Sequence, residues 1–353
     1  MVVKKGKTPP PLDHLGDVLI AWAGANRQRS DIAEVVVGLA SGARNLAAIL
    51  ARGALAGDIS AATGATNSDG DVQKTIDVVA NDIFIAALKH TPAAFLASEE
   101  SDAPIALREG GTLAVAIDPL DGSGNVSVNL TVGAIFSILP AAQTAKASFL
   151  RPCADQLAAG YFLFGSSTLL VLTVGAGVDL FVLDPDDQTF KRAEASLRVP
   201  DSAADIAINM SNRRHWPAPT RTFVDDCIEG VGGPRGVDCY ARWLAVMVAE
   251  AHRILLRGGV YLYPADARPG FEQGRLRLLY EAAPIAMLME QAGGAATDGH
   301  ARILEKTPLS LHERTPLVFG SAKEVESIRH YHDDPAYNQD AAPLFHQRGL
   351  FKS

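Results

Sequence analysis

Two aspartates and a Gly-Ser-Gly turn follow a run of apolar residues in the first half of the chain. The stretch IDPLDGSGN spans residues 117–125, and the apolar run GTLAVAI that leads into it predicts a buried strand. Asp118 and Asp121 then lie where this strand leaves its sheet. Two carboxylates so close together disfavour joint ionisation unless a cation lies between them. The stretch therefore predicts half of a metal site.

The D-P-x-D pattern occurs a second time, at residues 184–187. There it separates two β runs and predicts a hairpin turn in which Asp and Pro set the backbone angles. The pattern alone is weak evidence of a metal site, and a plain turn stays open at 118–121 as well. The first copy differs because Gly122, Ser123 and Gly124 follow it, and their backbone amides could hold a phosphate oxygen.

Five further carboxylates end a predicted strand or lie near the start of a predicted helix: Asp71, Asp77, Glu99, Glu100 and Glu281. Four of them have an ordinary alternative, namely a solvated face for the two adjacent glutamates, a helix cap for Asp71 and compensation of a helix dipole for Glu281. Together they offer an all-oxygen ligand set with no nearby Cys or His, which favours Mg²⁺ or Mn²⁺ over zinc. Such ions serve phosphoryl chemistry.

The elements that must position these residues alternate between helices and strands. The apolar spacing predicts two helices over residues 15–55, the second capped by Ser30 or Asp31, and a third over 72–89. Short apolar runs predict three strands, at 95–98, 113–117 and 132–139, and the longer stretch 160–193 predicts an antiparallel meander. Beyond residue 200 the pattern is α/β, with strands and helices alternating: 204–209, 220–229, 240–256, 259–264, 276–294 and 316–320.

Composition and charge limit the class of protein. The chain has 353 residues, 48% of them hydrophobic, and a net charge of −8 with a pI near 5.6, so it can bury a large core and is not expected to bind nucleic acid or a membrane. Three widely spaced cysteines without a CxxC pair predict neither a disulfide framework nor a zinc site. We expect a cytoplasmic protein, because no signal-peptide pattern follows the N-terminus.

The predicted organisation has two domains. An N-terminal α+β domain over residues 13–200 carries the metal-binding carboxylates, and a C-terminal α/β domain over 201–340 follows it. A disordered leader is expected at 1–12 and a tail at 341–353.

Several segments resemble the signature segments of class I fructose-1,6-bisphosphatase. They are, in chain order, GDVQKTIDVVANDIF, SEE (98–100), DPLDGSGN (118–125), AINMSNRRHW, ARWLAVMVAEAHRILLRGGVYLYP and LRLLYEAAPIAMLMEQAGGAATDG (276–299). The resemblance implies an α/β fold with layered α-β-α-β-α architecture. It also implies metal-dependent hydrolysis of the 1-phosphate of D-fructose 1,6-bisphosphate to fructose 6-phosphate and phosphate, in gluconeogenesis or the Calvin cycle.

The resemblance further implies roles for the carboxylates. One metal would be held by four of them: Glu99, Asp118, Asp121 and Glu281. Glu99, Asp118 and the carbonyl of Leu120 would hold a second ion, and Asp71 with Glu99 a third or transient one, giving two to three Mg²⁺ ions per subunit with Mn²⁺ as an alternative. Asp77 and Glu100 would orient and deprotonate the attacking water.

The substrate would be held at both phosphates. The resemblance places the 1-phosphate beside Asp121, over the amides of Gly122 and Ser123. The other end would meet Asn212, Tyr263 and Arg275, and Tyr280 would help to form the pocket wall. Arg242 would be supplied by a neighbouring subunit of a homotetramer. From the residues alone, other roles stay open. Arg275 and Arg277 could form surface salt bridges, and Tyr263 could be a core aromatic. Arg242 opens a predicted apolar helix beside Trp243, so it could be a plain capping or interface arginine.

The chain departs from the family pattern at several positions. Gly124 stands where Ser is usual, Val-Ser at 126–127 where Ile-Asp is common, Arg275 where many members have Lys, and His215 where many have Tyr. The stretches that correspond to the family's AMP site read RQRSDIAEVV, Thr112-Leu113 and Pro140, and they lack its lysine and its late arginine. We therefore expect weak or absent inhibition by AMP.

Three other functions stay open. Sedoheptulose-1,7-bisphosphatase activity, alone or beside the fructose activity, is not separated by the sequence. An inositol or nucleotide phosphatase is disfavoured, because Tyr280-Glu281 stands where those relatives carry a Trp-Asp segment. A metal-binding regulatory protein without turnover is the alternative outside the enzymes.

Overall fold

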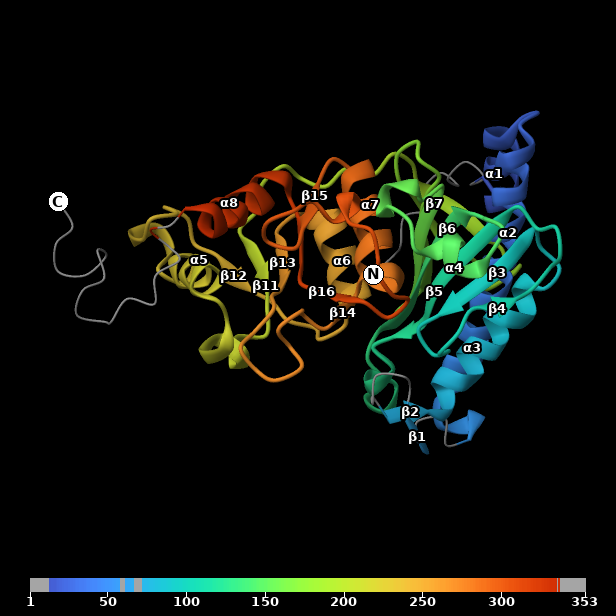
Figure 1. The fold of residues 1–353 in the computed structure, drawn as a ribbon, viewed down its shortest axis with the longest axis horizontal. Helices are drawn as coiled ribbons and strands as arrows, with labels where there is room; N and C mark the ends of the chain where they lie inside the picture. The colour runs from blue at the N-terminus through green and yellow to red at the C-terminus, as the bar shows by residue number, and fades with distance from the viewer. Residues whose placement is uncertain (1–12, 58–60, 67–71, 335, 337–353) are drawn as a thin grey trace, which may run out of the picture.

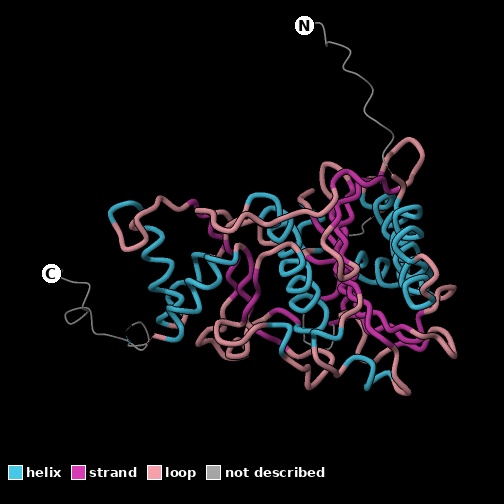
Figure 2. Tube along the Cα trace, turned by 90° about the horizontal axis from the view of Figure 1, so that it is seen from above, coloured by secondary structure: helices cyan, strands magenta, loops and turns pink. Residues whose placement is uncertain are grey.

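The computed structural model describes residues 13–57, 61–66, 72–334 and 336. Two mixed sheets alternate with three layers of helices along the long axis of the molecule (Figures 1 and 2). The predicted α-β-α-β-α layering is confirmed. The predicted leader, the predicted tail and Asp71 lie outside the described residues.

The first sheet has eight strands in the order β10-β9-β8-β7-β6-β5-β3-β4. Their bounds are β3 Ala93–Ser98, β4 Ile105–Ala106, β5 Leu113–Asp121, β6 Val132–Pro140, β7 Ala158–Phe164, β8 Thr168–Thr173, β9 Asp179–Leu183 and β10 Phe190–Glu194. Only β3 and β5 pair in parallel, and β7 to β10 form the predicted antiparallel meander. The second D-P-x-D stretch is the predicted hairpin turn between β9 and β10, where Asp184 Oδ1 accepts a hydrogen bond from the amide of Asp186 at 2.9 Å.

Three helices cover the outer face of this sheet (Figure 1): α1 Leu15–Ala23, α2 Arg27–Leu50 and α3 Thr75–Leu88. Helix α2 is long and apolar enough to cross a membrane, with a mean hydropathy of 1.4 over 18 residues, but half of that window is buried in the protein. The predicted caps of α2 are wrong. Asn26 caps it by accepting from the amide of Arg29, and the Asp31 carboxylate instead accepts from the hydroxyl of Thr112 at 2.6 Å.

The second sheet has the order β12-β11-β13-β17-β15. Its strands are β11 Asp205–Ala207, β12 Tyr240–Ala241, β13 Val260–Tyr263, β15 Ala295–Thr297 and β17 Leu317–Gly320. Helices α6 Met247–Arg257 and α7 Ala283–Gln291 lie between the two sheets, and α5 Ala218–Ile228 and α8 Ala322–Asp333 cover the far face (Figure 1). The remaining short elements are β1 Ala62–Thr66, β2 Val72–Lys74, α4 Ala145–Phe149, β14 Leu276–Arg277 and β16 Arg314–Thr315.

Three predicted helices begin later than the apolar spacing indicates. Those expected at 72–89, 240–256 and 276–294 are preceded by β2, β12 and β14, and their helical parts begin at Thr75, Met247 and Leu278. The reason is strand pairing, for example of Tyr240 with Asp205, which a local pattern does not reveal. The last helix also opens with a π-helical turn, Leu278–Ala282.

Candidate active site

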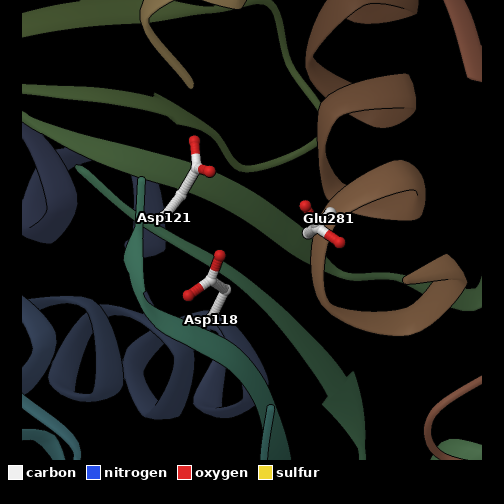
Figure 3. A group of neighbouring side chains, drawn as sticks. All are labelled: Asp118, Asp121 and Glu281. Atoms are coloured by element: carbon white, nitrogen blue, oxygen red, sulfur yellow. The ribbon is translucent and has the colours of Figure 1, made fainter. Parts of the chain in front are cut away.

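Three carboxylates from two distant segments face one another between the sheet and helix α7 (Figure 3). One oxygen each of Asp118, Asp121 and Glu281 lie within 4.8 Å of one another. In a regular strand, residues three apart point to opposite faces. Here Asp118 pairs with Ile135 and Asp121 with Gly133, so three steps along β5 match two along β6, and the resulting bulge turns both aspartates towards Glu281.

A backbone amide fixes each of these carboxylates. Leu120 N donates to Asp118 Oδ1 at 2.9 Å, and Val248 N at the start of α6 donates to Asp121 Oδ2 at 2.7 Å. Arg277 N donates to Glu281 Oε2 at 2.5 Å. Three separate parts of the chain therefore orient the three ligands before any ion binds.

Burial makes the ionised forms of these carboxylates costly. It raises the pKa of Glu99 to about 7 and of Asp121 to about 6, and it holds the pKa values of Asp118 and Glu281 well above their usual range. Repulsion from neighbouring carboxylates adds to the effect for Glu99, Asp118 and Glu281. A small cation would remove this cost, and the oxygen-only donors suit Mg²⁺ or Mn²⁺. The residues present therefore fit the predicted metal site.

Glu99 follows β3, the strand beside β5, and its amide donates to Ile117 O at 3.0 Å. The Nε atom of Arg277 lies 3.8 Å from Glu99 Oε1, and the Arg277 side chain is 2% exposed. A surface salt bridge is thus the wrong interpretation for Arg277, which is a buried cation facing the acidic cluster. Its position four residues before Glu281 was the signal available in the sequence, although Arg277 lies in β14 and not in the helix that follows.

Asp77 connects the third helix to the glycine-rich turn. In the first turn of α3 its Oδ2 accepts from the amide of Lys74 at 2.8 Å, and it also hydrogen-bonds Ser123. Burial raises its pKa. Glu100 is half-buried directly after β3, and its amide donates to Ser98 Oγ at 3.3 Å. The structure thus places Asp77 at the turn itself.

The turn after Asp121 requires glycine at its first position. Gly122 has φ +79, and a Cβ there would lie 2.7 Å from a methyl group of Val246. Gly124, where the family usually has Ser, has more space, because a Cβ would have only Lys74 Nζ nearby, at 3.5 Å. Lys74 was not predicted from the sequence as a residue of this site.

The residues expected around the other end of the substrate come from the second sheet and its loops. Asn212 lies in a 3₁₀ turn, Met210–His215, Tyr263 ends β13 as predicted, and Arg275 precedes β14 with its guanidinium 4.8 Å from the ring centre of Phe271. All three are half-buried.

Arg242 and Tyr280 lie in other surroundings than expected. Arg242 does not open helix α6 but follows β12, and its guanidinium Nε donates to Asp205 Oδ2 at 3.0 Å. Tyr280 has no exposed surface and packs with Ala97, Phe149 and other residues behind the acidic cluster, its ring centre 5.4 Å from that of His312. Its role at a pocket wall stays a prediction that this burial does not favour.

Comparison with known proteins agrees with this geometry. Residues 21–195 match the family model described as fructose-1-6-bisphosphatase, N-terminal domain, and residues 199–333 match the corresponding C-terminal domain. The chain belongs to the fructose-1,6-bisphosphatase family. A class 1 fructose-1,6-bisphosphatase of Cereibacter sphaeroides is 51% identical over 324 residues, which cover 92% of this chain and 96% of that protein. A class 1 relative from Methylorubrum populi is 49% identical over 348 residues, covering 98% and 100%.

A solved structure supports the same conclusion. The holo form of Leishmania major fructose-1,6-bisphosphatase superposes with a TM-score of 0.86 at 32% identity, covering 92% of this chain and all of that one. The family, fold and enzyme class predicted from the sequence are confirmed: this is a phosphatase of the class 1 family. That family is metal-dependent, and the acidic cluster described above is where an ion could bind.

Proposed function

We propose that the chain hydrolyses the 1-phosphate of fructose 1,6-bisphosphate at the acidic cluster, with two to three Mg²⁺ or Mn²⁺ ions held by its carboxylates. The observation that supports this most is the convergence of Asp118, Asp121 and Glu281 within 4.8 Å. Glu99, the Leu120 carbonyl and Asp71 would complete the ligand set. The ions would supply Lewis-acid stabilisation of the charge on phosphate and on the leaving oxygen.

The chain's own residues would position the reactants. The carboxylates of Asp77 and Glu100 would orient the attacking water and accept its proton, and burial supports this for Asp77 by raising its pKa towards that of a useful base. The backbone after Asp121 would hold the 1-phosphate at Gly122 and Ser123, since Gly122 leaves no side chain in the turn. These groups would act by proximity and orientation.

The distal phosphate would be bound from the second sheet. Asn212 follows β11, and Tyr263 ends β13, which pairs with β11 in parallel. Arg275 precedes β14, whose partner β16 leads into the strand opposite Tyr263. Arg275 offers a planar cation suited to two phosphate oxygens. In a homotetramer Arg242 would reach the site of a neighbouring subunit. Its side chain is 49% exposed, which leaves it accessible for such a contact.

Weak or absent regulation by AMP also belongs to the proposal. Leu113 is fully buried, Thr112 is bonded to Asp31, and Pro140 carries no side-chain donor, so these positions offer no cation to a nucleotide phosphate. A cytoplasmic location and a gluconeogenic or carbon-fixing pathway are compatible with this chemistry.

Phosphate release by the purified protein with Mg²⁺ tests the proposal. Fructose 1,6-bisphosphate, sedoheptulose 1,7-bisphosphate and inositol monophosphate are compared, with Asp121→Ala as the blank. We expect turnover of a sugar bisphosphate that the variant loses. A folded, metal-binding protein that releases phosphate from none of the three would instead be the regulatory protein without turnover.

A further inference from the structure

One short segment joins Arg242 to the phosphate-binding turn. It runs from the end of β12 to the start of α6, over residues 242–248. At its far end Val246 packs against Gly122, and the amide of Val248 donates to Asp121 Oδ2 at 2.7 Å. The segment therefore joins the phosphate-binding turn of its own subunit to the arginine proposed to reach the distal phosphate in a neighbouring subunit.

Asp205, at the start of β11, contacts this segment through two arginines. Its Oδ2 accepts from Arg242 Nε at 3.0 Å and from Arg253 Nη1 at 2.7 Å. Its side chain is 17% exposed, whereas that of Arg242 is 49% exposed. The Asp205 side chain is thus largely enclosed, whereas the arginine side chain that it contacts is about half exposed.

A second carboxylate holds the backbone of the same segment. Glu250 is fully buried, and its Oε1 accepts from the amide of Leu244 at 2.7 Å. Its Oε2 lies 2.9 Å from Arg253 Nη2 and accepts from Arg253 Nε at 3.0 Å. Arg253 therefore links the carboxylate that holds the Arg242 side chain to the one that holds the Leu244 amide.

This arrangement determines which face of Arg242 a ligand can meet. A guanidinium is planar, and a bond at Nε fixes the direction of the plane while leaving the two terminal nitrogens for a bidentate contact. An arginine on an exposed segment otherwise samples many rotamers, and its ordering on binding costs affinity. A partner that orders it beforehand lowers that cost.

We propose that Asp205 is a positioning residue that orients Arg242 for the distal phosphate of a sugar bisphosphate. With Arg253 and Glu250 it forms a bracket that holds residues 242–248 in one conformation. The inference rests on the proposed contact between Arg242 and substrate, and Asp205 itself touches neither substrate nor metal.

The variant Asp205→Asn, in the full-length enzyme with Mg²⁺, tests the bracket. We expect KM for fructose 1,6-bisphosphate to rise on the order of tenfold with kcat nearly unchanged, because Glu250 still holds the Leu244 amide and only the Arg242 side chain loses its orientation. Competitive inhibition by fructose 6-phosphate should weaken by a similar factor, whereas competitive inhibition by fructose 1-phosphate should not change. Glu290→Gln is the matched control, because Glu290 pairs with Arg302 at the same exposures, 18% and 49%, on helix α7.

The variant Arg242→Ala separates the proposed contact of Arg242 with substrate from the positioning role of Asp205. An unchanged KM in this variant would refute the proposed contact of Arg242 itself. A raised KM in Arg242→Ala, beside an unchanged KM in Asp205→Asn, would overturn only the positioning role. Equal weakening of both monophosphates would also overturn it, since general loosening of the fold has that effect.

A variant that combines Asp205→Asn with Arg242→Ala should bind the bisphosphate no more weakly than Arg242→Ala alone. If Asp205→Asn does not fold, Arg242→Lys keeps the charge but loses the Nε donor. It should raise KM for the bisphosphate in the same way, and an unchanged KM would overturn the inference.

Discussion

Without divalent metal, the protein should become less stable as the pH rises from 7 to 8. Burial and mutual repulsion hold the pKa values of Asp118 and Glu281 well above 3.8 and 4.5. The folded chain therefore releases these protons at a higher pH than the unfolded chain does, so any such proton still bound above pH 7 is one that the unfolded chain has lost. Stability present at lower pH is therefore lost as the pH rises through the folded pKa values.

The magnitude follows from the number of extra protons in the folded state. One extra proton gives a loss of about 1.4 kcal/mol per pH unit. We count one and not several, because the carboxylates titrate as a coupled group. At about 2 °C per kcal/mol for a chain of this size, the melting temperature should fall by up to about 3 °C between pH 7 and 8.

The range from pH 7 to 8 lies above the titration of two buried histidines, whose effect on stability has the opposite sign. Burial lowers the pKa values of His252 and His332 to about 4, so their contribution is lost as the pH falls below 6.5 and is nearly complete at pH 7. Thermal unfolding with EDTA and with saturating Mg²⁺ isolates the acidic cluster. At 100 times the dissociation constant, Mg²⁺ should add about 2.7 kcal/mol, because it binds the ionised carboxylates of the folded state.

The variant Glu281→Gln provides the decisive comparison. Its amide oxygen can still accept from Arg277 N, but it carries no proton to lose, so we expect a shallower decline with pH and weaker stabilisation by Mg²⁺. Glu290→Gln should retain the wild-type behaviour. Stability that stays level or rises from pH 7 to 8 without metal, or an unchanged slope in Glu281→Gln, would refute the electrostatic argument.

Three further predictions concern the turn, the core and the regulatory region. Gly122→Ala should lower kcat/KM at least tenfold and destabilise the fold by about 1–3 kcal/mol. The reason is that a Cβ would lie 2.7 Å from Val246, on a backbone with φ +79. Assays of activity and of thermal melting would check both effects. Phe162→Ala should cost about 3–5 kcal/mol in urea unfolding, since its ring packs against three other phenylalanines and is fully buried, and a loss below 1 kcal/mol would contradict this. AMP titrated to millimolar concentration should leave activity within twofold, and strong inhibition would show that a cation at a position other than 112, 113 and 140 binds the nucleotide.

The sequence by itself determined the order of the longer strands and helices along the chain and the types of side chain available at the candidate site. Apolar alternation marked β5 and the meander, because side-chain periodicity follows directly from backbone geometry. Carboxylates at strand and helix ends marked Asp118 and Glu281, because buried charge has few uses other than ion binding. The specific segments also indicated the family, through residues such as Asp121 in its glycine-rich turn.

Only the tertiary structure decided which of these residues meet. The bulge that turns Asp118 and Asp121 to one side depends on pairing with β6, and the late start of helix α6 depends on pairing of β12 with β11. Arg277 could be taken for a surface residue until Glu99 was placed beside it. Contacts between segments far apart in the sequence set burial and partners, and a local pattern contains neither.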